Sequence, residues 1–279
     1  MRLDRVLRIV RLDLAEVRRS RWMTVTLAVY GILLGVFLLV GMRESAILGF
    51  TGLGRVLLNF SNALVLLLPL LALSVTAQII PRAREDGTLE MLMSQPLSRG
   101  EYFVGLALTR MSLLIIPLLI LAGAMAVLAG WAFGEPAPWA YLGSLLLASI
   151  TLIIAFVGIG LLISTTCRNS ARTLIYTLAA WVIGVALLDF ALIGVMLQWR
   201  INPQTIFTLA ALNPIQDARL ILLSSADPEL SILGPVGFYL TNRLGTTWLY
   251  IICAGWPTIV GIATTALAYS HFKRTDLLG

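Results

Sequence analysis

The chain has 279 residues, of which 59% are hydrophobic and only 12% are charged, and its mean hydropathy is +0.93. A soluble domain is nearer half apolar and a quarter charged, so this balance excludes an ordinary soluble protein and indicates an integral membrane protein. The net charge of +6 does not indicate nucleic-acid binding. Most of the arginines flank apolar runs, where they act as topology signals and do not form one basic face.

Residues 1–21 are predicted to form a basic amphipathic helix that lies in the plane of the lipid headgroups, here called the elbow helix. Its apolar residues recur at helical spacing, and arginines occupy most of the remaining positions. A signal peptide is the competing interpretation, but the charged region is too long and no A-x-A site follows the next apolar run. The apolar stripe consists of Leu3, Val6, Leu7, Val10, Leu14 and Val17.

Six apolar runs follow the elbow helix, and each is long enough for a transmembrane helix, which needs about 20 mostly apolar residues. Prolines inside these runs are tolerated where neighbouring helices satisfy the freed backbone groups. The sequence therefore predicts an all-α integral membrane protein that forms a single transmembrane domain over residues 1–279. The predicted spans are 23–40, 57–80, 102–131, 140–164, 174–197 and 248–269.

The basic residues determine the predicted orientation, because loops rich in arginine and lysine stay on the cytoplasmic side. When the amino terminus is placed inside, most of the basic residues fall on that side. Both termini are therefore predicted to be cytoplasmic. The basic residues left outside are Arg43, Arg55, Arg200, Arg219 and Arg243.

The loop between the last two predicted spans, residues 198–247, is long and external in this orientation. Turn signals such as Asn213-Pro214 separate short, partly apolar helices that are predicted at 205–212 and 215–223. The sequence predicts a structured external cap, part of which can dip back into the bilayer as a protein-buried segment.

The residue types that carry common catalytic chemistry are scarce. Lys273 is the only lysine and is not preceded by a glycine, so the chain cannot bind ATP through a P-loop. His271 is the only histidine, which excludes an HExxH zinc site and makes a Ser-His-Asp triad implausible. Cys167 and Cys253 lack metal or redox spacing and are predicted to be two free thiols. We expect no catalytic residue and no metal site in this chain.

Asp189 is the one acidic residue well inside a predicted span, the fifth, where a carboxylate is costly. One interpretation is that it lines a substrate pathway or a subunit interface. The alternative is a structural acid that snorkels or forms a hydrogen bond, paired with Arg200 or Arg243.

The loop between the second and third spans, residues 81–100, has the most specific pattern in the chain. Residues 84–93 are predicted to form one short amphipathic helix, with Leu89, Met91 and Leu92 as apolar contacts. An exposed helix that carries both acidic and apolar residues suits docking into a groove on a partner protein. The alternative is a plain connecting loop at the headgroups.

The run E-D-G-T-L-E-x-L-x-x-x-P-L-S-R, from Glu85 to Arg99, resembles the coupling helix of type-2 ABC permeases. In that family an amphipathic amino-terminal helix precedes six spans, and this loop inserts into a separate ATPase subunit. The stretch NPIQDARLILL at 213–223 and the tail FKRTDL at 272–277 are also similar, so the resemblance covers essentially the whole chain. Within the family the chain is most similar to NosY-like permeases, which belong to the system that matures the copper sites of nitrous oxide reductase.

The resemblance implies that this chain is a non-catalytic permease subunit of the cytoplasmic (inner) membrane. Two copies would sit on two ATPase subunits, which would bind the ATP and magnesium, and Gly87 would let the backbone turn tightly. The loop 165–172 would be a second contact, although Asn169 and Ser170 could equally be helix caps. The implied ATPase-docking residues are Glu85, Asp86, Gly87, Thr88, Leu89, Glu90, Met91, Leu92, Arg99, Thr166, Arg168, Asn169 and Arg172.

Three functions are compatible with the sequence. A NosY-like permease would move a sulfur species, and a periplasmic accessory protein could sit on the external cap at 198–247. A general exporter of lipids, drugs or peptides would have the same architecture. A membrane scaffold would anchor an assembly complex without transporting anything. In each of these the partners are proteins and the lipid bilayer, and nucleic acid is not a partner.

Overall fold

The computed structural model describes residues 24–33, 35–36, 52–94, 98–132, 139–187, 203–226 and 245–274, together with residues 10, 230, 237 and 242. These parts are helical and contain no strand. The elbow helix is outside the described residues except for Val10, and so are Asp189 and most of the residues between 227 and 244. What the sequence predicts for those parts stays a prediction.

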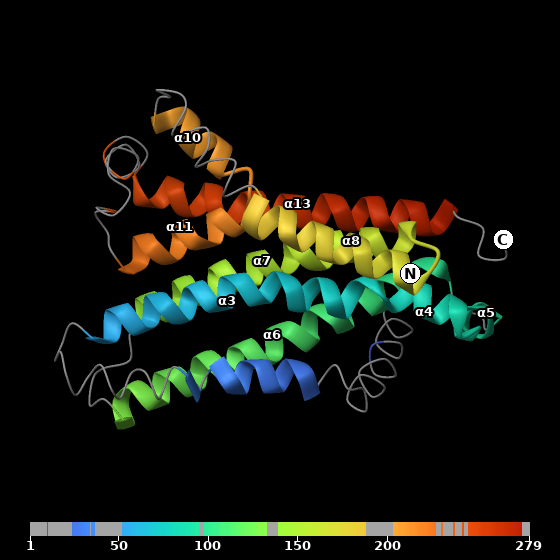
Figure 1. Cartoon of the computed structure of the whole chain (residues 1–279), viewed down its shortest axis with the longest axis horizontal. Helices are drawn as coiled ribbons and strands as arrows, with labels where there is room; N and C mark the ends of the chain where they lie inside the picture. The colour runs from blue at the N-terminus through green and yellow to red at the C-terminus, as the bar shows by residue number, and fades with distance from the viewer. Residues whose placement is uncertain are drawn as a thin grey trace.

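Four long helices lie side by side and form the body of the molecule (Figure 1). They begin and end within a few residues of the second, third, fourth and sixth predicted spans. By length and composition, four helical segments of the described chain can cross a membrane, namely Asn62–Glu85, Arg99–Leu128, Trp139–Thr166 and Thr246–Arg274. The long helices are α3 (Gly52–Ala77), α6 (Arg99–Ala132), α7 (Trp139–Thr166) and α13 (Thr246–Arg274).

The first and fifth predicted spans are described only in part. The first is represented by the apolar helix Thr24–Leu33, and the fifth by Ser170–Ala186, which contains α8 (Ser170–Val182) and the beginning of the π-helix η2 (Ile183–Leu187). The described residues are therefore helical, as expected of an all-α integral membrane protein, while the count of six spans and the cytoplasmic position of both termini remain predictions.

Helix α7 is the centre of the bundle, because it packs against α3, α6, α11 and α13. Glycines allow the closest of these approaches. A Cβ atom on Gly158 of α7 would collide with the backbone oxygen of Gly261 on α13, and one on Gly160 would collide with Thr76 on α3. Backbones that approach this closely are typical of helices packed in a membrane, where small residues at the interface maximise van der Waals contact.

Two shorter helices occupy the region that the sequence assigns to the external cap. These are α10 (Pro203–Ala210), which lies at one end of the bundle, and α11 (Pro214–Ala226) (Figure 1). α11 packs against α3, α7 and α13, and Ala218 and Ile221 on it are buried. The predicted helix at 215–223 is thus present, but it is part of the bundle.

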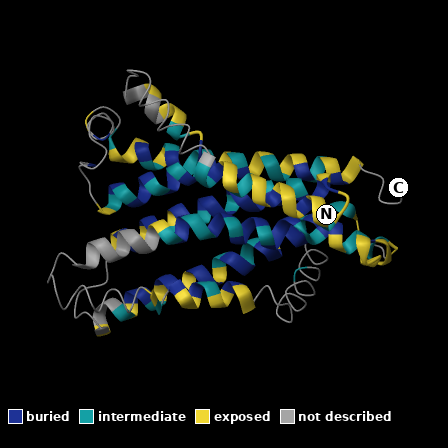
Figure 2. Cartoon of the chain, in the orientation of Figure 1, coloured by how far each residue is buried: buried dark blue, intermediate teal, exposed yellow. Residues whose placement is uncertain are grey.

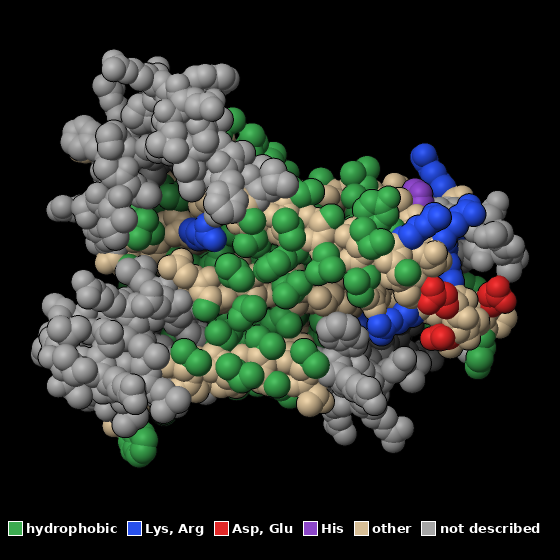
Figure 3. Space-filling view, in the orientation of Figure 1, with side chains coloured by type: hydrophobic (Ala, Val, Ile, Leu, Met, Phe, Trp, Pro, Cys, Tyr) green, Lys and Arg blue, Asp and Glu red, His purple; other side chains and the backbone are tan. Residues whose placement is uncertain are grey.

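The exposed surface of the helices is largely apolar. Buried residues face the inside of the bundle (Figure 2), whereas large apolar side chains such as Ile120 of α6 and Ile262 of α13 point outward. Figure 3 shows the apolar surface along the length of the bundle, with the acidic and most of the basic side chains visible in this view gathered at one end. Soluble proteins rarely expose apolar patches of this extent, so lipid is the expected surrounding of these helices.

Candidate functional site

The end of the bundle opposite α10 carries two short helices, α4 (Ile79–Glu85) and α5 (Thr88–Met93), and is here called the α5 end (Figure 1). The single helix predicted at residues 84–93 is wrong. The chain leaves α4 at Asp86 and passes through Gly87, whose φ of 68° lies in the left-handed region, before α5 begins. Glycine adopts this conformation without steric cost, so it separates one predicted helix into two.

The residues of α5 divide between an inward and an outward face. Leu89 is only 1% exposed and belongs to the core of the bundle, whereas Met91 is 69% exposed. Glu90 is exposed beside Met91, and the Thr88 hydroxyl donates a hydrogen bond of 3.2 Å to the carbonyl of Ala83 in α4. One apolar residue therefore anchors α5, and another is left available on its outer surface.

Glu85, the last residue of α4, connects this loop to the beginning of α8. Its carboxylate accepts hydrogen bonds from the backbone N–H of Ser170, at 2.7 Å, and from the Ser170 hydroxyl, at 2.6 Å. The first N–H groups of a helix have no partner inside the helix and favour a negative charge. The contact therefore ties two loops that are 85 residues apart in the sequence.

Asn169 is the N-cap residue of α8, because its side-chain oxygen accepts a hydrogen bond of 3.0 Å from the backbone N–H of Arg172. The interpretation of Asn169 as a helix cap is confirmed. Deeper in the bundle, the Ser164 hydroxyl accepts a hydrogen bond of 3.1 Å from the backbone N–H of Ile80, at the beginning of α4. Together with Glu85, Ser164 fixes α4 to both α7 and α8.

The beginning of α6 is fixed to the end of α13 at the same end of the bundle. The ring of Phe103 lies 5.7 Å from that of Tyr269 and 5.8 Å from that of Phe272, measured between centroids. A guanidinium nitrogen of Arg99 donates a hydrogen bond of 3.2 Å to the carbonyl of Lys273. Arg99 thus satisfies a carbonyl group in the last turn of α13, which would otherwise lack a partner within the helix.

All thirteen predicted docking residues lie at the α5 end, on α4, α5 and the turn between them, at the start of α6, or in the stretch from the last residue of α7 to the first turn of α8. Most of them are exposed, Leu92 and Arg99 are half-buried, and Leu89 is buried. Figure 3 shows acidic side chains at this end with basic side chains beside them. Both cysteines are free, as predicted, and both are buried. Among the described residues, no group of three or more His, Cys, Asp or Glu side chains could hold a metal ion.

Sequence reasoning did not single out Asp217 as a notable residue. This residue of α11 is fully buried, and its carboxyl oxygens accept no hydrogen bond of ordinary geometry from the described residues. The thiol of Cys253 on α13 is close enough to interact with it electrostatically. An acid within the partly apolar stretch 215–223 was the available signal, but the turn residues around that stretch indicated a surface position.

Comparison with known proteins adds an independent finding. The sequence model of a family described as "ABC-2 family transporter protein" matches residues 7–277. A probable ABC transporter permease protein NosY of Stutzerimonas stutzeri is 26% identical over 98% of this chain and 99% of that protein. A probable NosY permease of Pseudomonas aeruginosa is 27% identical over 96% of this chain and 98% of its own length. A probable multidrug ABC transporter permease, YbhR of Escherichia coli, is 28% identical over 72% of this chain but only 48% of that protein.

Proposed function

The chain belongs to the ABC-2 family of transporter proteins, and we propose that it is a permease subunit whose α5 end docks a separate ATPase on the cytoplasmic side. The observation that carries this proposal is the pair of hydrogen bonds between Glu85 and Ser170. These bonds connect the two loops that the predicted topology places in the cytoplasm, and the connected loops form one unit with α5 on its outer side. Such a unit can receive a force on α5 and pass it to the spans.

The docking surface is proposed to be the outer face of this unit. Met91 and Glu90 supply an exposed apolar contact and a charge, and an amphipathic helix of this kind binds by inserting its apolar residue into a groove. Because α5 has only six residues, the α7–α8 loop would add a second contact. The residues assigned to that second contact are Thr166, Arg168, Asn169 and Arg172.

Coupling then follows from the contacts inside the unit. The partner ATPases would bind ATP and magnesium, and their closure would displace α5. Glu85 would transmit this displacement to α8, and the hydrogen bond between Ile80 and Ser164 would transmit it to α7. Two copies of the chain in the inner membrane would then alternate the access of cargo at their shared interface.

The cargo is proposed by similarity alone. The NosY relatives match nearly the full chain, which favours a sulfur species for copper-site maturation, with a periplasmic accessory protein on residues 198–247. A general exporter is the second candidate, because the multidrug permease YbhR is 28% identical over its matched part.

The test is to purify the tagged chain from its native membrane in mild detergent and to identify the proteins bound to it. The variant Glu90→Arg/Met91→Asp changes only exposed positions of α5, so it should insert normally and lose a stoichiometric P-loop ATPase. The matched control Lys273→Glu/Arg274→Asp reverses charges at exposed positions of the same end and should retain the ATPase. Full retention by the α5 variant would refute docking through α5, and absence of any ATPase from the wild type would refute the permease assignment.

A further inference from the structure

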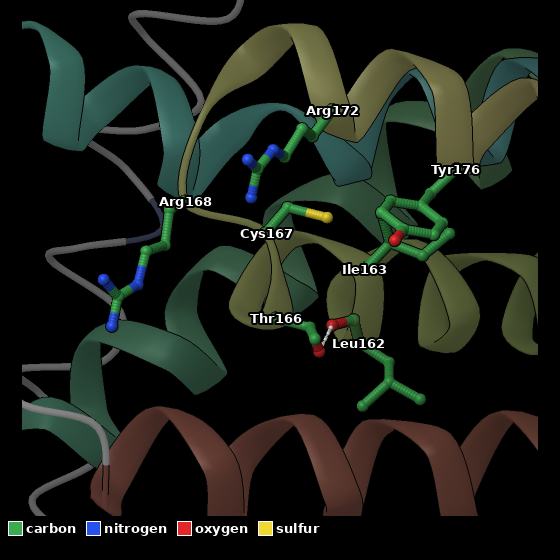
Figure 4. Close-up of a pocket in the computed structure, with 7 residues that line it drawn as sticks. All are labelled: Leu162, Ile163, Thr166, Cys167, Arg168, Arg172 and Tyr176. Carbon is green, nitrogen blue, oxygen red and sulfur yellow. Dashed lines mark hydrogen bonds between the residues drawn. The ribbon is translucent and has the colours of Figure 1, made fainter.

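A cavity of about 350 Å³ lies where α7 ends and α8 begins (Figure 4). Its size is at the lower limit of ordinary ligand pockets, so it suits a small headgroup better than a large cargo molecule. Apolar side chains, two arginines, a thiol and a phenol face it. The lining residues are Leu162, Ile163, Thr166, Cys167, Arg168, Arg172 and Tyr176.

Positive charge gathers around this cavity. Neither Arg168 nor Arg172 forms an ion pair or a side-chain hydrogen bond with any residue in the described part of the chain. Arg84 of α4 is close enough to Arg168 for the two cations to repel each other. Its Nε and Nη2 atoms are buried and have no hydrogen-bond partner among the described residues. The carboxylate of Glu85 accepts hydrogen bonds from Ser170, and its one negative charge only partly offsets the positive charges of Arg84, Arg168 and Arg172.

Arg168 and Arg172 are exposed at the cavity, and the buried Nε and Nη2 atoms of Arg84 have no hydrogen-bond partner among the described residues. Because buried polar groups in proteins are almost always hydrogen-bonded, and because three positive charges gather here, an anionic ligand is the favoured occupant. Arginine in particular matches the planar, bidentate geometry of phosphate oxygens. The cavity therefore has the chemistry of a phosphate site.

The position of the cavity indicates where that phosphate comes from. It lies at the end of the apolar span α7, where the boundary between membrane and water is expected, and Tyr176 is a residue type enriched at that boundary. Leu162 and Ile163 form an apolar part of the lining. The neighbouring surface of α8 exposes Leu174 and Ile175, which would contact acyl chains. A free phosphate would not need these apolar surroundings.

We propose that this cavity binds the phosphate headgroup of an anionic membrane lipid, held by Arg168 and Arg172, with its acyl chains along α8. The bound lipid would fix the α7–α8 loop, whose Ser170 also holds Glu85. The proposal does not depend on docking of an ATPase. The experiments use the permease without its ATPase, so a contact of the same arginines with the ATPase cannot affect the result.

The first measurement uses Cys167, whose thiol lies between Arg172 and Tyr176 (Figure 4). The wild-type chain is placed in nanodiscs of neutral phosphatidylcholine, with or without added phosphatidylglycerol, and its reaction with a maleimide is followed by peptide mass spectrometry. We expect phosphatidylglycerol to slow the labelling of Cys167 severalfold. Cys167 lines the cavity and is 6% exposed, whereas Cys253 is 0% exposed and lines no part of the cavity, so Cys253 is the internal control and should stay unlabelled. Equal labelling rates in the two lipid mixtures would overturn the proposal.

The second measurement is native mass spectrometry of phosphatidylglycerol bound to the detergent-solubilised chain. In Arg168→Gln/Arg172→Gln the affinity should fall about 30-fold, since each basic group near an anionic lipid contributes about a factor of five. The control Lys273→Gln/Arg274→Gln removes the same charge at the same end and should bind like the wild type. An equal loss in the control would show that only the general surface charge matters, and would refute a specific site.

A third arm separates the two sources of phosphate. Inorganic phosphate is added to the chain in phosphatidylcholine nanodiscs, and the labelling of Cys167 is repeated. Protection equal to that given by phosphatidylglycerol would assign the cavity to a soluble anion and overturn the lipid assignment. We expect no protection by phosphate. The wild-type labelling experiments decide the question even if the arginine variants fail to fold.

Discussion

The division of α5 into an anchoring and an outward face makes a quantitative prediction for a matched pair of variants, Leu89→Ala and Met91→Ala. Both remove an apolar side chain of similar size from the same short helix. Leu89 is 1% exposed, so its truncation removes about three buried carbon groups at about 0.8 kcal/mol each. Because α5 is short and near the surface, it can relax into the space, and we expect a cost of about 2 to 3 kcal/mol, at the lower end for buried leucine.

The assay is amide hydrogen exchange of α5 in detergent micelles, which reports the free energy of local opening. In Leu89→Ala the α5 amides should exchange roughly 30- to 150-fold faster, as a loss of about 2 to 3 kcal/mol requires. In Met91→Ala exchange should stay as in the wild type, because the side chain is 69% exposed and its truncation removes little buried surface. Unchanged exchange in Leu89→Ala, or faster exchange in Met91→Ala, would refute the assignment of the two faces.

Three further predictions concern single positions. Gly158→Ala should destabilise the bundle by about 1 to 3 kcal/mol and so lower its thermal midpoint in detergent, because the added Cβ atom would collide with the backbone of Gly261. The control Gly143→Ala should leave the midpoint unchanged, because a Cβ atom there has no neighbour within 4 Å. Gly87→Ala should destabilise α5 by about 1 to 2 kcal/mol, which faster amide exchange of α5 would measure. The cost comes from the positive φ alone, because a Cβ atom at this position has no neighbour within 4 Å. Asp217→Leu should raise the thermal midpoint, because among the described residues the buried carboxyl group has only the weak thiol donor of Cys253 beside it, and a buried polar group without a full hydrogen bond costs about 1 to 3 kcal/mol. A lower midpoint in that last variant would show that the carboxyl group is paired in the membrane-embedded protein.

The sequence predicted the four long helices well, for a simple physical reason. An apolar run of about 20 residues or more has few stable alternatives to a helix in a membrane, so composition alone determines both its existence and its approximate ends. The two loops at the α5 end were also identified as a pair. Their connection through Glu85 and Ser170 was not, because a hydrogen bond across 85 residues leaves no trace in local periodicity.

Local patterns failed where a single residue or the tertiary packing decides the structure. The periodicity of residues 84–93 predicts one helix, and only the left-handed conformation of Gly87 divides it. The stretch 215–223 is predicted as a short helix of the external cap, and part of that cap is expected to be buried in protein. Its helix, α11, is buried, but local patterns did not identify α3, α7 and α13 as its packing partners, because tertiary packing decides them.

The packing of the bundle also constrains how the proposed coupling could work. α7 and α13 meet backbone to backbone at Gly158 and Gly261, so one cannot slide past the other without collisions. α8 is held differently, by polar contacts such as the Trp181 indole N–H to the carbonyl of Leu66, at 3.2 Å, and by the exposed bonds of Ser170 to Glu85.

The bonds between Ser170 and Glu85 can be broken and remade at low cost, because water can replace an exposed hydrogen bond, whereas the part-buried bond of Trp181 lacks this replacement. α8 also continues directly into the π-helix η2, and short π-helical segments often occur at functional sites. A force applied to α5 would therefore displace α8 more readily than it would separate α7 from α13. In an alternating-access permease, the α8–η2 segment is therefore the element expected to move when the ATPase closes. A spin label or a crosslink between α8 and α3 would measure that movement.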